Sequence, residues 1–238
     1  MKKLLLIALT VCGFIGAQSF ANPLFLLTPY HGPGSSATYL IQQGFEGAGY
    51  DNSESWTESG STINEDYTGI ALVGSQSLRI NTVSAQADTT SPAFASTSEI
   101  WGYCRFRPVD IDASTSIFGG FVGSGADRLE LRINSSGQII VFHGSNSATT
   151  IDAMSEGTTY HVWWYYKVGT GVNGLASVGF STDGTKPTSG NKFVSLSNGT
   201  ATQNITTVHF GNFGGFNRTI DFVFDRVLVD DVEIGSNP

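Results

Sequence analysis

The stretch TYHVWWYYKV, residues 159–168, is the part of this sequence that decides the fold class. It places four aromatic residues in a row, from Trp163 to Tyr166. In a β-strand, successive side chains point to opposite faces of the sheet. One face would carry Tyr160, Val162, Trp164, Tyr166 and Val168, and the other would carry His161, Trp163, Tyr165 and Lys167. The pattern predicts a strand with one side in a core and the other on a polar, partly aromatic face.

Two further segments alternate in the same way. In residues 100–107, the apolar side would carry Ile100, Gly102, Cys104 and Phe106, and the opposite side Trp101, Tyr103, Arg105 and Arg107. In residues 128–133, the apolar side would carry Leu129, Leu131 and Ile133, and the opposite side Arg128, Glu130 and Arg132. Both patterns predict strands that are buried on one side only.

The rest of the sequence has the composition of an all-β protein. It contains 29 Gly and only 2 Met, and short β-branched and aromatic runs alternate with clusters of Gly, Asn, Asp and Ser. The expected strands are residues 39–45, 77–80, 100–107, 116–122, 128–133, 138–142, 160–168, 176–181, 206–210 and 222–229. Their spacing favours a two-sheet antiparallel β-sandwich over β-α-β units.

The N-terminus has the features of a secretory signal. MKK precedes an apolar run that ends near Ala17, and Ser19-Phe20-Ala21 forms a small-x-small cleavage pattern. We therefore expect a signal peptide over residues 1–21, an N-terminal arm over residues 22–37 and a single domain over residues 38–238. The mature protein would be secreted or periplasmic. No later segment has the ~18 consecutive apolar residues of a membrane-spanning helix.

Charge and cysteine content restrict the partners and the means of stabilisation. With Lys2 and Lys3 removed, 10 of the 12 basic residues remain against 20 acidic ones, and the formal charge falls from −8 to −10. This balance argues against nucleic acid and anionic membranes as general partners. Cys104 would be the only cysteine left after loss of Cys12, so no intramolecular disulfide is expected.

Four motifs, in their order and spacing, resemble the laminin-G-like and concanavalin A-like jelly rolls and the β-sandwich carbohydrate-binding modules. They are GFEGAGYDNSESW (44–56), GSQSLRI (74–80), GTTYHVWWYYK (157–167) and FDRVLVDDVEI (224–234). The resemblance covers about residues 39–234 and implies a concanavalin A-like jelly roll in which the first and last strands pair. That pairing would bring Glu46 close to Asp230 and Asp231, where similar modules hold a structural Ca²⁺. The alternative is that these acids are simply solvated at a strand end.

The side chains opposite the predicted core form the candidate ligand-binding face. They are Trp101, Tyr103, Arg105, Arg107, Arg128, Arg132, His161, Trp163, Tyr165 and Lys167. If their strands share a sheet, they make one aromatic and basic surface. Aromatic rings stack on the C–H faces of sugars, and arginines pair with carboxylate or sulfate, so this surface predicts a glycan or polysaccharide partner, with an acidic one favoured. The alternative is that the arginines pair with Glu130 and that loops cover the rings.

Three functions remain open at this stage. The first is a non-catalytic carbohydrate-binding or adhesion module, and the second is a structural, matrix-type sandwich without a small ligand. The third is a uronate lyase, because RLELR (128–132) and YYKVG (165–169) resemble alginate-lyase strands and could supply Arg128, Arg132, His161 and Tyr165. The Q-[IV]-H element of those lyases is missing, since QIIVFHG places His143 at a different spacing. The paired carboxylates of a jelly-roll glycosidase are also missing.

Overall fold

The computed structural model describes residues 30–31, 39–51, 55–60, 62–111, 115–121, 129–212 and 217–238, with only the backbone for residues 30–31 and 115–121. The expected signal peptide, most of the expected arm and Arg128 lie outside these residues, so their assignment stays a prediction. The described part of the chain contains strands and no α-helix. Accordingly, it has no helix that is long and apolar enough to cross a membrane.

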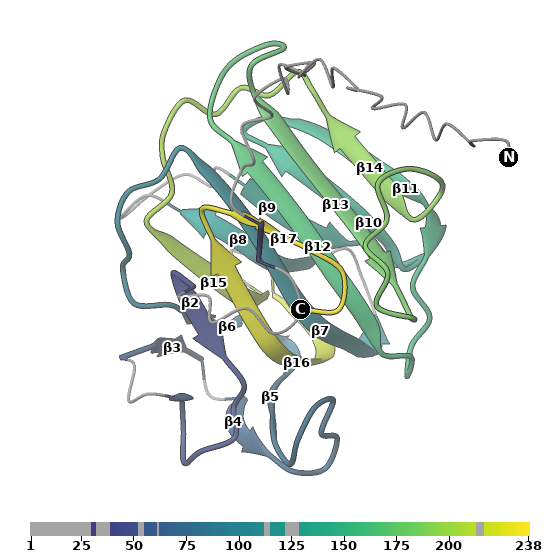
Figure 1. Ribbon diagram of the computed structural model, residues 1–238. Coiled ribbons are helices and arrows are strands. Elements are labelled where there is room, and N and C mark those ends of the chain that lie inside the picture. The colour runs from purple at the N-terminus through teal and green to yellow at the C-terminus, as the bar shows by residue number, and fades with distance from the viewer. Residues whose placement is uncertain are drawn as a thin grey trace, which may run out of the picture.

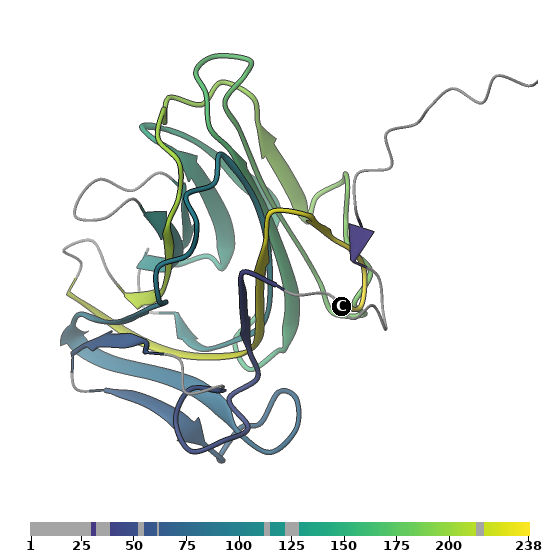
Figure 2. The ribbon, with the colours of Figure 1, turned by 60° about the vertical axis from the view of Figure 1, so that its left-hand side comes forward.

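Two β-sheets pack face to face, and all neighbouring strands within them are antiparallel. The seven-stranded sheet has the order β11(Asn146–Ala153), β10(Gln138–His143), β9(Leu129–Ile133), β8(Thr115–Phe121), β15(Thr207–Asn212), β6(Ala87–Thr90), β3(Thr57–Ser59). The eight-stranded sheet has the order β14(Phe193–Leu196), β13(Leu175–Ser181), β12(Tyr160–Lys167), β7(Glu99–Ile111), β16(Arg218–Asp230), β5(Ser77–Ala85), β4(Ile63–Tyr67), with β2(Ile41–Gln43) also paired to β16. The two sheets form curved layers (Figures 1 and 2). The predicted antiparallel β-sandwich is confirmed.

The inner faces of the sheets form one hydrophobic core. Trp164 and Tyr166 of β12 are buried there, as the alternation predicts. The Trp164 ring meets Phe210 of β15 edge-on at a centroid distance of 6.3 Å, which joins the two sheets. On β7, the predicted core side is confirmed as well, because Ile100, Cys104 and Phe106 belong to the same cluster.

Gly102 shows why one position of the apolar side of β7 carries no side chain. It lies directly opposite Trp164 on the neighbouring strand β12. A Cβ atom at position 102 would collide with the indole ring of Trp164. The glycine therefore provides the space that the largest core side chain of β12 occupies.

All ten predicted strands are present, and β1, β3, β4, β6, β11, β14 and β17 are additional. The C-terminal segment, residues 231–238, leaves the end of β16 and contains β17(Glu233–Ile234), which pairs in parallel with β1(Tyr30–His31). This segment lies against the outer side of the eight-stranded sheet, in front of β12 and β7 in Figure 1. Its position decides which outer side chains reach solvent.

Candidate functional site

The candidate site lies on the outer face of the eight-stranded sheet, the side that points away from the core. Strands β7 and β12 are adjacent and antiparallel, and their register places Trp101 opposite Tyr165, Tyr103 opposite Trp163 and Arg105 opposite His161. Eight of the ten side chains expected to bind ligand therefore share one face: Trp101, Tyr103, Arg105, Arg107, His161, Trp163, Tyr165 and Lys167.

Arg132 does not belong to this face. It lies on β9 in the seven-stranded sheet, where its guanidinium donates two hydrogen bonds of 2.7 and 2.8 Å to the carboxylate of Glu130 and stacks 4.5 Å from the ring of Phe142. The expectation that Arg132 shares a surface with His161 and Tyr165 is therefore wrong, because the core separates the two outer faces. The pairing of Arg132 with Glu130 is the alternative that the sequence left open.

Tyr103 and Trp163 are on the predicted face but are buried, with exposed fractions of 1% and 2%. Leu228 and Ile234 pack against them and form a second, smaller apolar cluster. The Trp163 indole N–H donates a 3.0 Å hydrogen bond to the carbonyl oxygen of Gly235. The expectation that both rings lie on an open surface is therefore corrected, because the C-terminal segment covers them.

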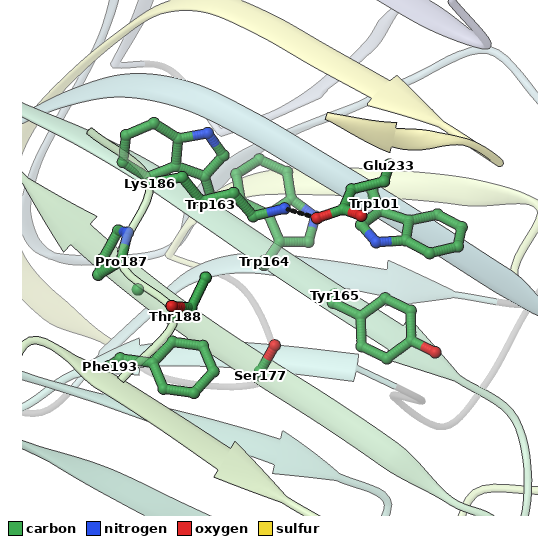
Figure 3. Close-up of a pocket in the computed structure, with 11 residues that line it drawn as sticks. Trp101, Trp163, Trp164, Tyr165, Ser177, Lys186, Pro187, Thr188, Phe193 and Glu233 are labelled. Atoms are coloured by element: carbon green, nitrogen blue, oxygen red, sulfur yellow. Dashed lines mark hydrogen bonds and ion pairs between the residues drawn. The ribbon is translucent and has the colours of Figure 1, made fainter. Parts of the chain in front are cut away.

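A hollow of about 230 Å³ opens beside this segment. Its lining consists of Trp101, Trp163, Trp164, Tyr165, Ser177, Gly179, Lys186, Pro187, Thr188, Phe193 and Glu233. Figure 3 shows the rings of Trp101 and Tyr165 on one side and Pro187, Thr188 and Phe193 on the other. The Trp101 and Tyr165 rings are tilted by 44° at a centroid distance of 5.0 Å. The hollow combines aromatic surface with hydroxyl groups, which suits an amphipathic ligand such as a sugar.

The sequence does not reveal the far wall of this hollow. Lys186, Pro187, Thr188 and Phe193 come from the connection between β13 and β14 and from the start of β14. The Lys186 ammonium donates 2.8 Å and 2.9 Å hydrogen bonds to the carboxylate of Glu233 and the carbonyl of Ile234. This ion pair attaches the loop to the C-terminal segment. No local sequence pattern predicts a contact between two segments that are so far apart in the chain.

Tyr165 is held in place by Glu99. Its hydroxyl donates a 2.7 Å hydrogen bond to the Glu99 carboxylate, which also lies 3.6 Å from the ammonium of Lys167. Burial, and then the hydrogen bond to Glu99, raise the pKa of the Tyr165 phenol. The phenol therefore keeps its proton at neutral pH, and its ring serves as a fixed wall of the hollow.

His161 is engaged through both ring nitrogens. Arg105 donates a 2.8 Å hydrogen bond to Nε2, so Nδ1 carries the proton and donates to the Tyr103 hydroxyl at 2.9 Å. Burial first, and the positive charge of Arg105 second, lower the pKa of His161 to about 4. The imidazole is therefore neutral at physiological pH, and neither nitrogen is free to exchange a proton with a ligand.

The expected grouping of Glu46 with Asp230 and Asp231 does not form. Strands β2 and β16 pair as the resemblance implies, but Ile41 lies opposite Val229 and Gln43 opposite Val227. In an antiparallel pair, residues that follow Gln43 run away from Asp230, so Glu46 lies at the other end of the paired segment. The Glu46 carboxylate instead accepts 2.9 Å hydrogen bonds from the backbone N–H and hydroxyl of Ser75.

Asp51 accepts a 3.1 Å hydrogen bond from the Glu46 backbone N–H, and the second acid that the charge of Glu46 influences is Asp225. Its fully buried carboxylate accepts hydrogen bonds of 2.7 Å from the Val73 backbone N–H and 3.0 Å from the Ser77 hydroxyl. Burial, and more weakly the charge of Glu46, raise the pKa of Asp225 to about 6. Glu46 and Asp225 thus hold the same segment, residues 73–77. Across the described residues, no three His, Cys, Asp or Glu side chains are arranged to hold a metal ion.

Comparison with known proteins identifies the fold class. No protein-family profile matches the sequence, and no curated protein sequence matches it. Among solved structures, a PL-14 alginate lyase from Aplysia kurodai is similar, with a TM-score of 0.60, 10% identity and coverage of 81% of this chain and 99% of that chain. An endo-β-1,4-glucuronan lyase from Trichoderma reesei has a TM-score of 0.57, 13% identity and coverage of 81% and 95%. The cellulose-induced protein Cip1 has a TM-score of 0.58, 17% identity and coverage of 83% and 100%. At these identities the shared property is the concanavalin A-like jelly-roll sandwich.

Proposed function

We propose that this protein is an exported, non-catalytic glycan-binding or adhesion module, of the laminin-G-like type, and that the hollow beside Trp101 and Tyr165 is its sugar site. The observation that carries the proposal is this hollow. It presents the two rings, the hydroxyl-bearing side chains of Ser177 and Thr188 and one Lys186–Glu233 ion pair around about 230 Å³. Sugar rings offer apolar C–H faces and hydroxyl edges, and this lining matches both.

Two of the similar structures are named as lyases of glucuronan and alginate, which supports a polysaccharide as the ligand class. Export is supported by the MKK sequence, the apolar run and the small-x-small pattern at the N-terminus. A sandwich fold serves many functions, so the proposal rests on the hollow and not on the fold.

The lyase alternative has the fold similarity in its favour, but the side chains of this chain do not form the required set. A lyase needs a cation at the uronate carboxylate and a group that takes and returns a proton. His161 is neutral with both nitrogens engaged, the Tyr165 phenol donates to Glu99, and Arg132 lies on the opposite outer face. A binding function therefore agrees better with the geometry than an eliminative one does.

A structural Ca²⁺ is the second part of the proposal, with Glu46 and Asp225 as its carboxylate ligands. Burying a carboxylate near another acid is costly, and a cation would add to the compensation that the hydrogen bonds from Val73 and Ser77 give Asp225. Calcium accepts carboxylate and backbone carbonyl oxygens in flexible geometry, so two carboxylates that hold the same segment, residues 73–77, would suit it. The ion would brace residues 73–77 against β16.

The test of the sugar site is a titration of the protein with neutral and acidic oligosaccharides, with Trp101→Ala as the variant and Trp56→Ala as the matched control. Trp56 stacks on Tyr50 at 5.1 Å, away from the hollow. We expect Trp101→Ala to weaken glycan binding roughly tenfold or more, because stacked aromatic anchors dominate such sites. Unchanged binding in Trp101→Ala, or an equal loss in both variants, would contradict the proposal.

A further inference from the structure

Beyond the C-terminal segment, the outer face carries three arginines. Arg105 and Arg107 alternate on β7 and so point to the same side of the sheet as Trp101 and Tyr103. Arg226 lies at an irregularity of the neighbouring strand β16, where the register to β7 shifts between Asp225 and Leu228. Arg105 and Arg107 are partly exposed, and Arg226 is exposed. We call these three side chains the arginine patch.

The patch is not neutralised by carboxylates of this chain, as far as the described residues go. The ion pairs found among the described residues involve cationic side chains outside the patch, namely Arg79, Arg132, Lys167, Lys186 and His209. The Nε atoms of Arg105 and Arg107 are buried and have no hydrogen-bond partner among the residues that the structure describes. Asp225 is opposite Arg105 in register, but its carboxylate accepts from Val73, Ser77 and the Arg226 backbone N–H.

The neighbours of the patch agree with a local positive potential. The side chain that accepts from Arg105 is the neutral imidazole of His161. After burial, the charges of Arg105 and Arg226 both lower the pKa of His161, while the exposed Asp183 acts in the opposite direction. In a chain of formal charge −8, three arginines that form no ion pair with an acid of the described residues are a local exception.

We propose that the arginine patch binds the anionic substituents, carboxylate or sulfate, of an acidic glycan whose sugar ring occupies the hollow. Guanidinium groups pair bidentately with both kinds of oxyanion. This inference rests on the proposed function, because it adds a second contact to the same ligand. It also includes Arg226, which no strand pattern places on this face.

The spacing of the two contacts determines the size of the ligand. Trp101 and Arg107 are six residues apart on one strand, which at about 3.3 Å per residue corresponds to roughly 20 Å. Tyr103 lies between them and is covered by the C-terminal segment. A monosaccharide cannot span this distance, so affinity should rise steeply once an acidic oligosaccharide reaches from the hollow to the patch.

The experiment compares binding of dextran, dextran sulfate and polygalacturonate to the wild type, Arg107→Gln, Arg226→Gln and the double variant. Lys192→Gln is the matched control, since Lys192 is exposed and precedes β14. We expect the double variant to lose roughly tenfold or more in affinity for the anionic polymers, because charge-assisted hydrogen bonds are lost. Binding of neutral dextran should stay unchanged, and thermal unfolding of each variant shows that it is folded.

The outcomes identify the anionic group and separate the arginine-patch proposal from the sugar-site proposal. A loss for dextran sulfate alone identifies sulfate, a loss for polygalacturonate alone identifies carboxylate, and a loss for both supports their shared chemistry. If the double variant behaves like Lys192→Gln, the arginine patch is overturned, while Trp101-dependent binding of a neutral sugar would leave the sugar site intact. If the arginines matter but Trp101→Ala has no effect, the patch stands and the sugar site falls. Equal competition by a DNA duplex would overturn the assignment to a glycan.

Discussion

Trp163 and Trp164 are consecutive in the chain, point to opposite sides of the eight-stranded sheet, and are both buried at 2% exposure. Trp164 lies in the core between the sheets, whereas Trp163 lies under the C-terminal segment and donates to the carbonyl of Gly235. The sheet is thus covered on both sides at this point. The part of the outer face that is open to solvent begins beyond the area that Ile234 and Gly235 cover.

Both tryptophans should therefore support stability. We expect Trp164→Ala and Trp163→Ala each to lower the free energy of unfolding by ~3–5 kcal/mol, as emptying a large buried site does. Trp101→Ala, which removes a partly exposed ring, should cost only about 1 kcal/mol. Urea denaturation of the three variants measures this order. A Trp163→Ala protein as stable as the wild type would show that the C-terminal segment does not cover the ring in solution.

Calcium should stabilise the protein through Glu46 and Asp225. A ligand that binds only the native state at a hundred times its Kd adds ~2.7 kcal/mol, so excess chelator should lower the melting temperature of the wild type. Glu46→Gln should lose this response, whereas Asp231→Asn should keep it, because Asp231 lies at the far end of the β2–β16 pairing. A melting temperature that does not respond to chelator, in protein shown to be metal-free afterwards, would remove the calcium proposal.

His161 should make stability depend on pH in the acidic range. Its folded-state pKa of about 4 is below the ordinary value of 6.5, so the unfolded state binds the proton first. The stability that His161 contributes is therefore present above pH 6.5 and is lost as the pH falls toward 4. We expect the stability difference between the wild type and His161→Gln to shrink from pH 7 to pH 4.5. A difference that does not change with pH would contradict the depressed pKa.

Asp225 should make stability depend on pH in the direction opposite to His161, over a similar acidic pH range. The Asp225 variant therefore complements the His161 variant. Its pKa of about 6 is raised above the ordinary value of 3.8, and its contribution to stability is lost as the pH rises through 6. In metal-free protein, the stability difference between the wild type and Asp225→Asn should grow in favour of the wild type as the pH is lowered from 7 to 4.5. The reverse trend would indicate that Asp225 is not buried as described.

The protein should show no eliminative activity. Incubation with alginate, polygalacturonate or glucuronan is expected to give no rise in ultraviolet absorbance, because His161 has no free nitrogen and the Tyr165 phenol is bound to Glu99. An increase in absorbance that Tyr165→Phe abolishes would establish the lyase alternative. The Tyr165→Phe variant otherwise loses one hydrogen bond, worth ~1–2 kcal/mol of stability.

The sequence alone determined the features that depend on neighbouring residues in one strand. Side-chain alternation follows from backbone geometry, so the core side of β12 with Trp164 and Tyr166, and that of β7 with Ile100 and Phe106, could be predicted correctly. The same local rule placed Trp101 and Tyr165 on the outer face.

Only the tertiary structure decided which strands share a sheet, in which register they pair and what covers them. Arg132 has the same alternation as Arg105, yet its strand belongs to the other sheet. Glu46 and Asp230 lie at opposite ends of the paired segment, because pairing of β2 with β16 also sets a direction and a register. The physical reason is that alternation is a property of each backbone segment, whereas sheet order, register and the covering of Trp163 by Gly235 depend on contacts between residues far apart in the chain.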